Sequence, residues 1–141
     1  MIGLAPSAAA SRGTLPDGLR AAKAAAGARA YRIGLMAEDR VAEAYARQGH
    51  AELARRWRGA GGELDLIVRM GDEVVFVEVK CADTHAYAAE RLTRRQTGRL
   101  MQAAEEFLDT QPMGALTPMR FDVALVDRQG RIDIIENALW T

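Results

Sequence analysis

The stretch GGELDLIVRMGDEVVFVEVK, residues 61–80, decides the fold because it contains two apolar strands joined by a tight turn. The dipeptide Gly71-Asp72 at its centre is typical of a two-residue hairpin loop. In the register that this loop sets, Leu66 faces Val77 on a wholly apolar face. We therefore predict a β-hairpin whose apolar face packs in the core of the protein.

The other face of the predicted hairpin carries ionisable side chains at the end away from the turn. The register places Asp65 opposite Glu78 and Glu63 opposite Lys80. Two opposed carboxylates, with Cβ atoms roughly 5 Å apart, repel each other unless the pKa of one is raised or a cation lies between them. Mg²⁺ is usually held by one or two carboxylates with water and phosphate oxygens. Lys80, on the same face as Glu78, would stabilise charge on a phosphate or position an attacking water.

The charged end of the hairpin also has a plainer interpretation. In that interpretation the side chains are solvated, and Glu63 and Lys80 form a cross-strand ion pair. Two observations favour a metal site instead. The two strands are too apolar for the edge of a sheet, and the glycine-rich turn at residues 58–62 lets a backbone or a phosphate approach closely.

The rest of the sequence predicts an α/β domain with the element order α-β-β-β-α-β-β. A first helix covers residues 31–48, and a second covers residues 93–110. The apolar arc of the first helix contains Ile33, Met36, Ala37, Val41, Ala44 and Tyr45. The predicted strands cover residues 51–57, 63–70, 73–80, 119–126 and 131–136.

The composition excludes several classes of protein. The 141 residues carry 19 Lys and Arg against 19 Asp and Glu, with a single cysteine, Cys81. One cysteine excludes an intramolecular disulfide and a Cys-based zinc site, and it is typical of a reducing, cytoplasmic setting. We predict that Cys81 packs in the core. No apolar run is long enough to span a membrane. The zero net charge means that a nucleic-acid partner requires the basic residues to gather on one surface.

Residues 1–29 differ from the rest of the chain because they are rich in alanine and poor in acidic residues. We interpret them as a tail that is mobile or partly helical, with a short helix near residues 19–28. A transit peptide is an alternative interpretation of the same composition. The single folded domain then covers residues 30–141.

Several stretches of the sequence resemble the bacterial YraN family, also called UPF0102. They are GLMAED at 34–39, GGELDLI at 61–67, VFVEVK at 75–80, RFDV at 120–123 and IENA at 135–138. The pattern of Asp65 followed by Glu78-Val79-Lys80 also resembles the signature of restriction-endonuclease-like nucleases. The resemblance implies a restriction-endonuclease-like α/β core, with a mixed central β-sheet flanked by helices, similar to that of archaeal Holliday-junction resolvases.

The resemblance also implies roles for individual residues. Asp65 and Glu78 would bind Mg²⁺ or Mn²⁺, joined by Glu38 from the first helix, and Lys80 would assist hydrolysis. Glu63 is a candidate partner that orients Lys80. The alternative for Glu38 is an exposed helix carboxylate, because it lies at the edge of the apolar arc.

The start of the second helix holds the other candidates. Thr93 and Gln96 fit a capping box, but Gln96 also shares a face with Leu100 and would then point toward the strand ends. The family usually has Lys where this chain has Gln96, and a different basic pattern where this chain has Lys80-Cys81-Ala82. The candidate phosphate-contacting residues near this helix start are Arg91, Arg94, Arg95 and Arg99. Arg58 is a further candidate, and with Arg55 and Arg56 it flanks Trp57 before the glycine turn. The alternative for this basic cluster is a solvated face.

Together these features predict a Mg²⁺- or Mn²⁺-dependent endonuclease that hydrolyses DNA phosphodiesters, with branched or recombining DNA as a candidate substrate. The alternative is a non-catalytic nucleic-acid-binding or adaptor protein on a nuclease-like scaffold. A third hypothesis is a dimeric interaction module that uses residues 119–126 or 134–140. A homodimer is also expected for the nuclease, because related resolvases work as dimers.

Overall fold

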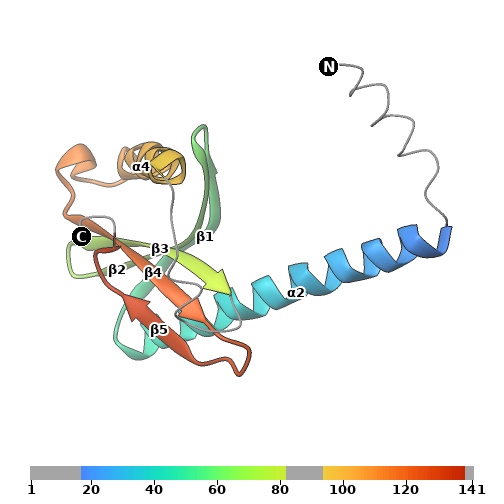
Figure 1. The fold of residues 1–141 in the computed structure, drawn as a ribbon. Coiled ribbons are helices and arrows are strands. Elements are labelled where there is room, and N and C mark those ends of the chain that lie inside the picture. The colour runs from blue at the N-terminus through green and yellow to red at the C-terminus, as the bar shows by residue number, and fades with distance from the viewer. Residues whose placement is uncertain (1–16, 82–93, 139–141) are drawn as a thin grey trace, which may run out of the picture. The chain divides into compact units, whose positions relative to one another are not determined.

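The computed structural model describes residues 17–81 and 94–138 of the chain (Figure 1). Its elements are the helices α2 (Asp17–Arg47) and α4 (Arg94–Leu108), the short 3₁₀ helix η1 (Gly114–Leu116), and the strands β1 (Ala51–Gly59), β2 (Gly62–Met70), β3 (Glu73–Cys81), β4 (Met119–Val126) and β5 (Ile132–Ile135). The predicted order α-β-β-β-α-β-β is confirmed. Among the described residues, no helix has both the length and the apolar character that crossing a membrane requires.

Contacts within the chain divide it into two units, Met1–Leu35 and Met36–Thr141. Helix α2 begins at Asp17 in the first unit and ends at Arg47 in the second. One helix therefore replaces the two that the sequence predicted near residues 19–28 and 31–48. The alanine-rich sequence without proline over this range allows the helix to continue.

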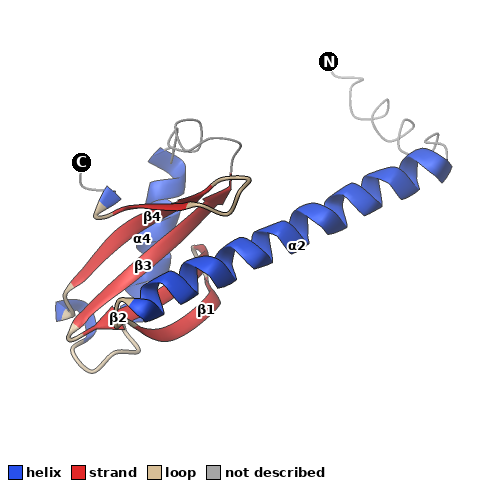
Figure 2. Cartoon of the chain, turned by 90° about the horizontal axis from the view of Figure 1, so that it is seen from below, coloured by secondary structure: helices blue, strands red, loops and turns tan. Residues whose placement is uncertain are grey.

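The five strands form one mixed sheet in the order β1-β2-β3-β4-β5. The strands β1, β2 and β3 are antiparallel neighbours, β3 and β4 are parallel, and β5 is antiparallel to β4. Figure 2 shows the strands side by side with α4 across one face. Helix α4 makes the crossover that two adjacent parallel strands require. The arrangement fits the endonuclease-like core that the resemblance implies.

One face of the sheet packs against the part of α2 that lies in the second unit. The buried residues of this core are Ala37, Val41, Ala42, Tyr45, Leu66, Val68, Val75, Val77, Ala124 and Val126. Two members of the predicted apolar arc, Ile33 and Met36, are exposed instead, because the buried positions of α2 begin at Ala37. Cys81, which we expected in the core, is also exposed at the end of β3.

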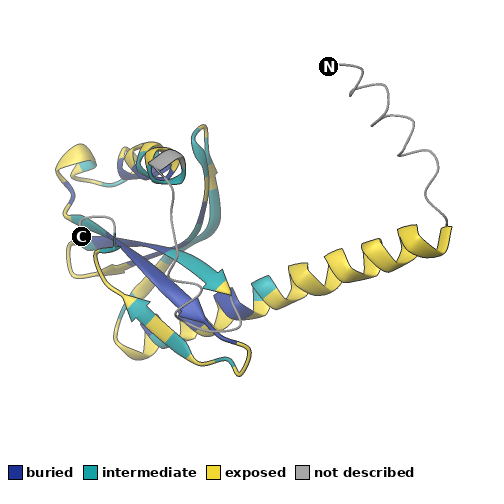
Figure 3. Cartoon of the chain, in the orientation of Figure 1, coloured by how far each residue is buried: buried dark blue, intermediate teal, exposed yellow. Residues whose placement is uncertain are grey.

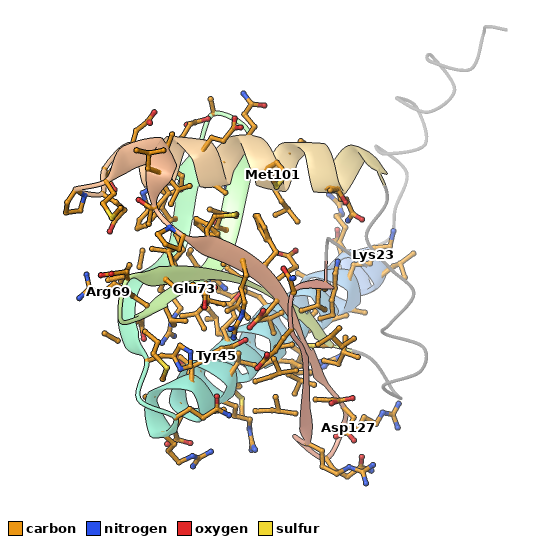
Figure 4. All side chains as sticks on the ribbon, turned by 90° about the vertical axis from the view of Figure 1, so that its left-hand side faces the viewer. Lys23, Tyr45, Arg69, Glu73, Met101 and Asp127 are labelled. Atoms are coloured by element: carbon orange, nitrogen blue, oxygen red, sulfur yellow. The ribbon has the colours of Figure 1, made fainter. Side chains whose placement is uncertain are left out.

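The other face of the sheet packs against α4. Its buried residues are Leu64, Ile67, Val74, Phe76, Leu100, Ala103, Ala104, Phe107, Leu108 and Phe121. Trp57 joins them through an edge-on contact with Phe107, with ring centroids 5.4 Å apart. Tyr45 on α2 and Met101 on α4 lie on opposite sides of the sheet (Figure 4), and the burial is deepest in the central strands (Figure 3).

The sheet is irregular where β1, β2 and β3 lie next to one another, in addition to the register shift between Glu52 and Ala54 of β1. The β2–β3 ladder follows the predicted register from the turn to Leu66 and Val77, and it ends there. Leu64 packs on the α4 side although Leu66 packs on the α2 side, which regular alternation along a strand does not allow. In β1, Arg56 has a φ of 53°. The acidic residues predicted for the site lie at this irregularity.

A buried polar network ties α2 to the C-terminal strands. The Asp122 side chain is fully buried, and its carboxylate accepts a hydrogen bond from the Tyr45 hydroxyl at 2.6 Å. It also accepts bonds from Nε of Arg120 at 2.9 Å and from the backbone N–H of Asn137 at 3.0 Å. Because a buried carboxylate is costly without such donors, the network fixes the position of β4 relative to the end of α2.

Candidate functional site

The candidate site forms where β2 and β3 separate. Beyond the last ladder pair, Leu66 with Val77, the backbone N–H of Val79 donates a hydrogen bond to Oδ2 of Asp65 at 2.9 Å. The Asp65 carboxylate therefore takes the place of a main-chain carbonyl and holds the two strands together. Burial raises the pKa of Asp65, although the bond from Val79 opposes the shift. The bond from Val79 thus fixes the Asp65 carboxyl group in surroundings that disfavour its charged form.

Glu78 lies beside Asp65, within hydrogen-bonding reach of it. Burial, and next the charge of Asp65, raise the pKa of Glu78 to about 8. The two carboxyl groups therefore titrate together, and the charged form of Glu78 is the more disfavoured. The structure brings these two predicted residues together, although they are neighbours across a gap in the ladder and not the ladder partners that the sequence predicted.

Lys80 lies two residues further along β3. Its charge acts to lower the pKa of both Asp65 and Glu78, so its ammonium group is within electrostatic reach of the pair. The partner that the sequence predicted for Glu63 differs from the one in the structure. Glu63 is the ladder partner of Arg58 on β1, and Oε2 of Glu63 is 3.7 Å from Nη2 of Arg58. The β2–β3 ladder ends before either residue, so Glu63 and Lys80 are not the ladder partners that the sequence predicted.

Glu38 reaches the site from α2. It is 8% exposed, so the alternative of an exposed helix carboxylate does not hold. Burial, and next the charge of Asp65, raise the pKa of Glu38, while Arg56 opposes the shift. Nε of Arg56 donates a hydrogen bond to Oε1 of Glu38 at 2.9 Å. Sequence reasoning placed Arg56 only in a basic run and missed this contact.

A small cavity opens beside the acidic pair. It has a volume of about 170 Å³ and is lined by Gly61, Gly62, Glu63, Glu78, Gln96, Arg99 and Leu100. Gln96 thus lines the same cavity as Glu78. The lining comes from the β1–β2 turn, from β3 and from α4. Glu78 on β3 contributes an acidic side chain, and Arg99 on α4 contributes a basic one.

The glycine turn between β1 and β2 is fixed to α4. The backbone N–H of Ala60 donates a hydrogen bond to the Glu106 carboxylate, at 2.8 Å from Oε1. A Cβ atom on Gly61 would lie 2.9 Å from the carbonyl oxygen of Arg99, so only glycine fits this approach. The sequence predicted a close approach at this turn but did not identify α4 as the partner or Glu106 as the anchor.

The predicted basic cluster is described in part. Arg99 is exposed and lines the cavity, and Arg58 is exposed beside Glu63. Arg91 and the side chains of Arg94 and Arg95 lie outside the described residues, so their contact with phosphate stays a prediction.

The acidic residues fit a hard divalent cation by the chemistry of their donors. In the part of the chain that the structure describes, no three His, Cys, Asp or Glu side chains stand together as a ready group of metal ligands. Asp65 and Glu78 are adjacent, whereas Glu38 is paired with Arg56. All three supply carboxylate oxygens from buried or half-buried positions, and a cation would relieve their mutual repulsion.

Comparisons with known proteins find one family. The model of the uncharacterised protein family UPF0102 matches residues 37–126. This range includes Glu38, Asp65 and Glu78, which together form the acidic cluster of the candidate site. A UPF0102 protein of Cereibacter sphaeroides is 58% identical over 108 residues, covering 77% of this chain and 92% of the relative. One of Ruegeria pomeroyi is 56% identical over 117 residues, covering 83% and 95%. One of Dinoroseobacter shibae is 48% identical over 119 residues, covering 84% and 89%.

Proposed function

We propose that this chain, which belongs to the uncharacterised protein family UPF0102, is a metal-dependent endonuclease that hydrolyses DNA phosphodiesters. The observation that carries the proposal is the adjacent pair of Asp65 and Glu78, with Lys80 in electrostatic reach of both. Two half-buried carboxyl groups with disfavoured charged forms, one of which lines a cavity, are typical of a functional site.

Asp65, Glu78 and Glu38 would hold Mg²⁺ or Mn²⁺. The bound cation would supply Lewis-acid stabilisation of the negative charge that develops on a phosphate oxygen. Asp65 is already fixed by Val79, and Glu78 is fixed by the parallel pairing of β3 with β4, where it faces Val123. Two of the three carboxylates are therefore preorganised on strands, which favours precise placement of a ligand.

Lys80 would act on the substrate and not on the cation. An ammonium group beside two carboxylates can hold a hydrogen bond to a water or to a phosphate oxygen. Its place two residues after Glu78 puts both side chains on the same side of β3. Lys80 would then position the attacking water, or stabilise the charge of the phosphate that the water attacks.

Arg99 and the glycine turn would contact the phosphate next to the one that is cleaved. The cavity joins Glu78 to Arg99, and the backbone of Gly61 and Gly62 lines the side between them. Backbone N–H groups and arginine are common phosphate contacts in protein–DNA complexes. Branched DNA and a homodimer are part of the proposal, because the resemblance to junction resolvases implies both.

A cleavage assay tests the proposal. The protein is incubated with linear, nicked and four-way-junction DNA in Mg²⁺, in Mn²⁺ and in EDTA. We expect cleavage in the metal-containing samples, and a loss of at least about 100-fold in Asp65→Asn and Glu78→Gln. Glu43→Gln, which alters an exposed carboxylate on α2, is the matched control and should cleave like the wild type. Cleavage that persists in both site variants, or is absent from every sample, would contradict the proposal.

One observation favours a second candidate, a non-catalytic nucleic-acid-binding or adaptor protein. The ion pair between Arg56 and Glu38 neutralises one of the three carboxylates with a cation of the chain itself. If this pair is permanent, the acidic cluster is structural and the arginines alone contact DNA. Salt-dependent DNA binding without cleavage and without measurable Mn²⁺ binding would identify this candidate.

A further inference from the structure

Arg56 has an unusual backbone and a buried partner. Its φ of 53° lies in the left-handed region, which a residue with a Cβ atom rarely adopts. Nε of its side chain contacts Oε1 of Glu38 at 2.9 Å, and the Glu38 side chain is almost completely shielded from water. Backbone conformations of this kind persist only where the surrounding structure compensates for their cost, and they gather at functional sites.

The neighbouring residue shows what this conformation does. In a regular strand the side chains of Arg55 and Arg56 would point to opposite faces. Here both contact carboxylates of α2, because Arg55 pairs with Asp39 and Arg56 pairs with Glu38. The left-handed turn at Arg56 therefore brings a second guanidinium group to the α2 side of the sheet, directly at the acidic cluster.

The two ion pairs differ in their surroundings. Asp39 has a side chain that is 71% exposed, so water can stabilise its charge without Arg55. Glu38 has a side chain that is 11% exposed and lies within electrostatic reach of Asp65 and Glu63. A carboxylate in that position needs a nearby cation, and Arg56 provides it.

We propose that Arg56 is an internal counter-ion that competes with the divalent cation for Glu38. This inference rests on the proposed function, because it concerns the same acidic cluster. In the metal-free protein the guanidinium group satisfies Glu38 and keeps it from completing a group of three carboxylate ligands. Binding of the cation with Glu38 as a ligand requires the Arg56–Glu38 pair to open, which weakens metal binding by the free energy of that pair. Arg56 therefore sets the metal concentration at which the site fills.

Metal titration without DNA tests this competition. Mn²⁺ is titrated into the wild type, Arg56→Gln and Arg55→Gln by calorimetry at pH 7.5. We expect Arg56→Gln to bind Mn²⁺ about ten- to a hundredfold more tightly than the wild type, as is typical of losing one charged hydrogen bond of a competing partner. Arg55→Gln removes the adjacent arginine and its ion pair and should bind like the wild type. Arg56→Gly, in which the left-handed backbone is unstrained, keeps the test valid if Arg56→Gln is poorly folded.

A double-mutant cycle identifies Glu38 as the group for which Arg56 competes. In the background of Glu38→Gln, the change Arg56→Gln should no longer increase the affinity for Mn²⁺. The competition is disproved if Arg56→Gln binds Mn²⁺ no more tightly than the wild type, or if the gain persists without Glu38. In either case measurable binding by the wild type leaves the proposed metal site intact. Absence of Mn²⁺ binding from the wild type and from both Arg56 variants would overturn the metal site as well.

Discussion

The backbone N–H of Val79 and the carboxylate of Asp65 are joined by a hydrogen bond of 2.9 Å, at the place where β2 and β3 stop pairing through their main chains. The side chain thus serves two purposes. It closes the hairpin, and it presents its remaining oxygen to Glu78. Substitutions of Asp65 must therefore be separated into those that break the strand contact and those that only remove the charge.

Two replacements of Asp65 should separate these purposes. Asp65→Asn keeps an oxygen acceptor for Val79 and removes the repulsion with Glu78, so its free energy of unfolding should match or exceed that of the metal-free wild type. Asp65→Ala leaves the Val79 N–H without this acceptor and should lower the free energy of unfolding by about 1–3 kcal/mol. Urea unfolding in EDTA measures both values. Equal stability of the two variants would show that the Val79 bond does not hold the strands.

The raised pKa of Glu78 should make the metal-free protein less stable as the pH rises. The group has an ordinary pKa of 4.5 and titrates at about 8 in the folded protein. Between these values the folded state binds more protons than the unfolded state, so the free energy of unfolding falls with increasing pH. The stabilisation is complete below 4.5 and is lost as the pH passes through 8. Melting temperatures in EDTA from pH 5 to 9 should fall less for Glu78→Gln than for the wild type, and an equal fall would contradict the assignment.

A substitution of Lys80 should affect DNA cleavage much more than the affinity for the metal ion. Lys80→Met removes the ammonium group and keeps most of the apolar stem, so we expect cleavage to fall by about 100-fold or more. The affinity for Mn²⁺ should change by only a few-fold, because Lys80 supplies no ligand to the metal. Its removal takes away only a positive charge that repels the metal ion. Lys23→Met, at the only other lysine of the chain, is the control. A loss of Mn²⁺ binding in Lys80→Met would assign Lys80 to the folding of the site and not to hydrolysis.

Replacing Gly61 or Gly98 by alanine should change the stability of the protein in opposite directions. A Cβ atom on Gly61 would lie 2.9 Å from the Arg99 carbonyl oxygen and from Cβ of Gln102, so Gly61→Ala should destabilise the protein by about 1–3 kcal/mol. Gly98 lies on the exposed side of α4, where an added Cβ atom would meet nothing within 4 Å, so Gly98→Ala should stabilise the protein by about 0.5–1 kcal/mol. Thermal unfolding of both variants checks the pair, and a neutral Gly61→Ala would show that the turn moves freely away from α4.

The buried network around Asp122 should contribute to stability. Tyr45→Phe removes the hydroxyl that donates to Asp122 at 2.6 Å and keeps the aromatic ring in the core. Because the acceptor is charged and fully buried, we expect a loss of about 1.5–3 kcal/mol in the free energy of unfolding. Chemical denaturation measures it. Burial, and next the bond to Asp122, raise the pKa of Tyr45, so at pH 10 the wild type and Tyr45→Phe should show the same phenolate absorbance, and a larger signal in the wild type would argue against the bond.

Much of the fold could be predicted from the sequence, because its strands are strongly apolar and its turns contain glycine. The Gly71 turn set the register of β2 and β3 correctly as far as Leu66 and Val77. The prediction failed beyond that pair, since a regular ladder assumes that main-chain groups bond to each other and Asp65 replaces one of them with its side chain. This is also why Glu63 and Lys80 are not ladder partners, although Glu63 pairs with Arg58 on β1.

The acidic residues of the candidate site could be predicted from the sequence, but the contact that Arg56 makes there could not. Asp65, Glu78 and Glu38 stand in recognisable stretches, and Gln96 follows helical spacing, so their approach could be expected. The left-handed backbone of Arg56 has no signal in the sequence, because arginine does not favour that conformation. The anchor from Glu106 to the glycine turn joins residues far apart in the sequence, and no local pattern reports such a contact.

The parallel pairing of β3 with β4 has a consequence for the order in which the protein assembles. Asp65 and Glu78 belong to one hairpin, and hairpins close within microseconds because few residues separate their strands. The neighbour of Glu78 on the other side, Val123, arrives only after the crossover through α4, and such non-local pairing is slow. We therefore expect the two acids to meet early in folding, in a chain whose Arg99 is not yet in place. The acidic pair would then form without its basic neighbour, and the cavity would be the last part of the domain to mature.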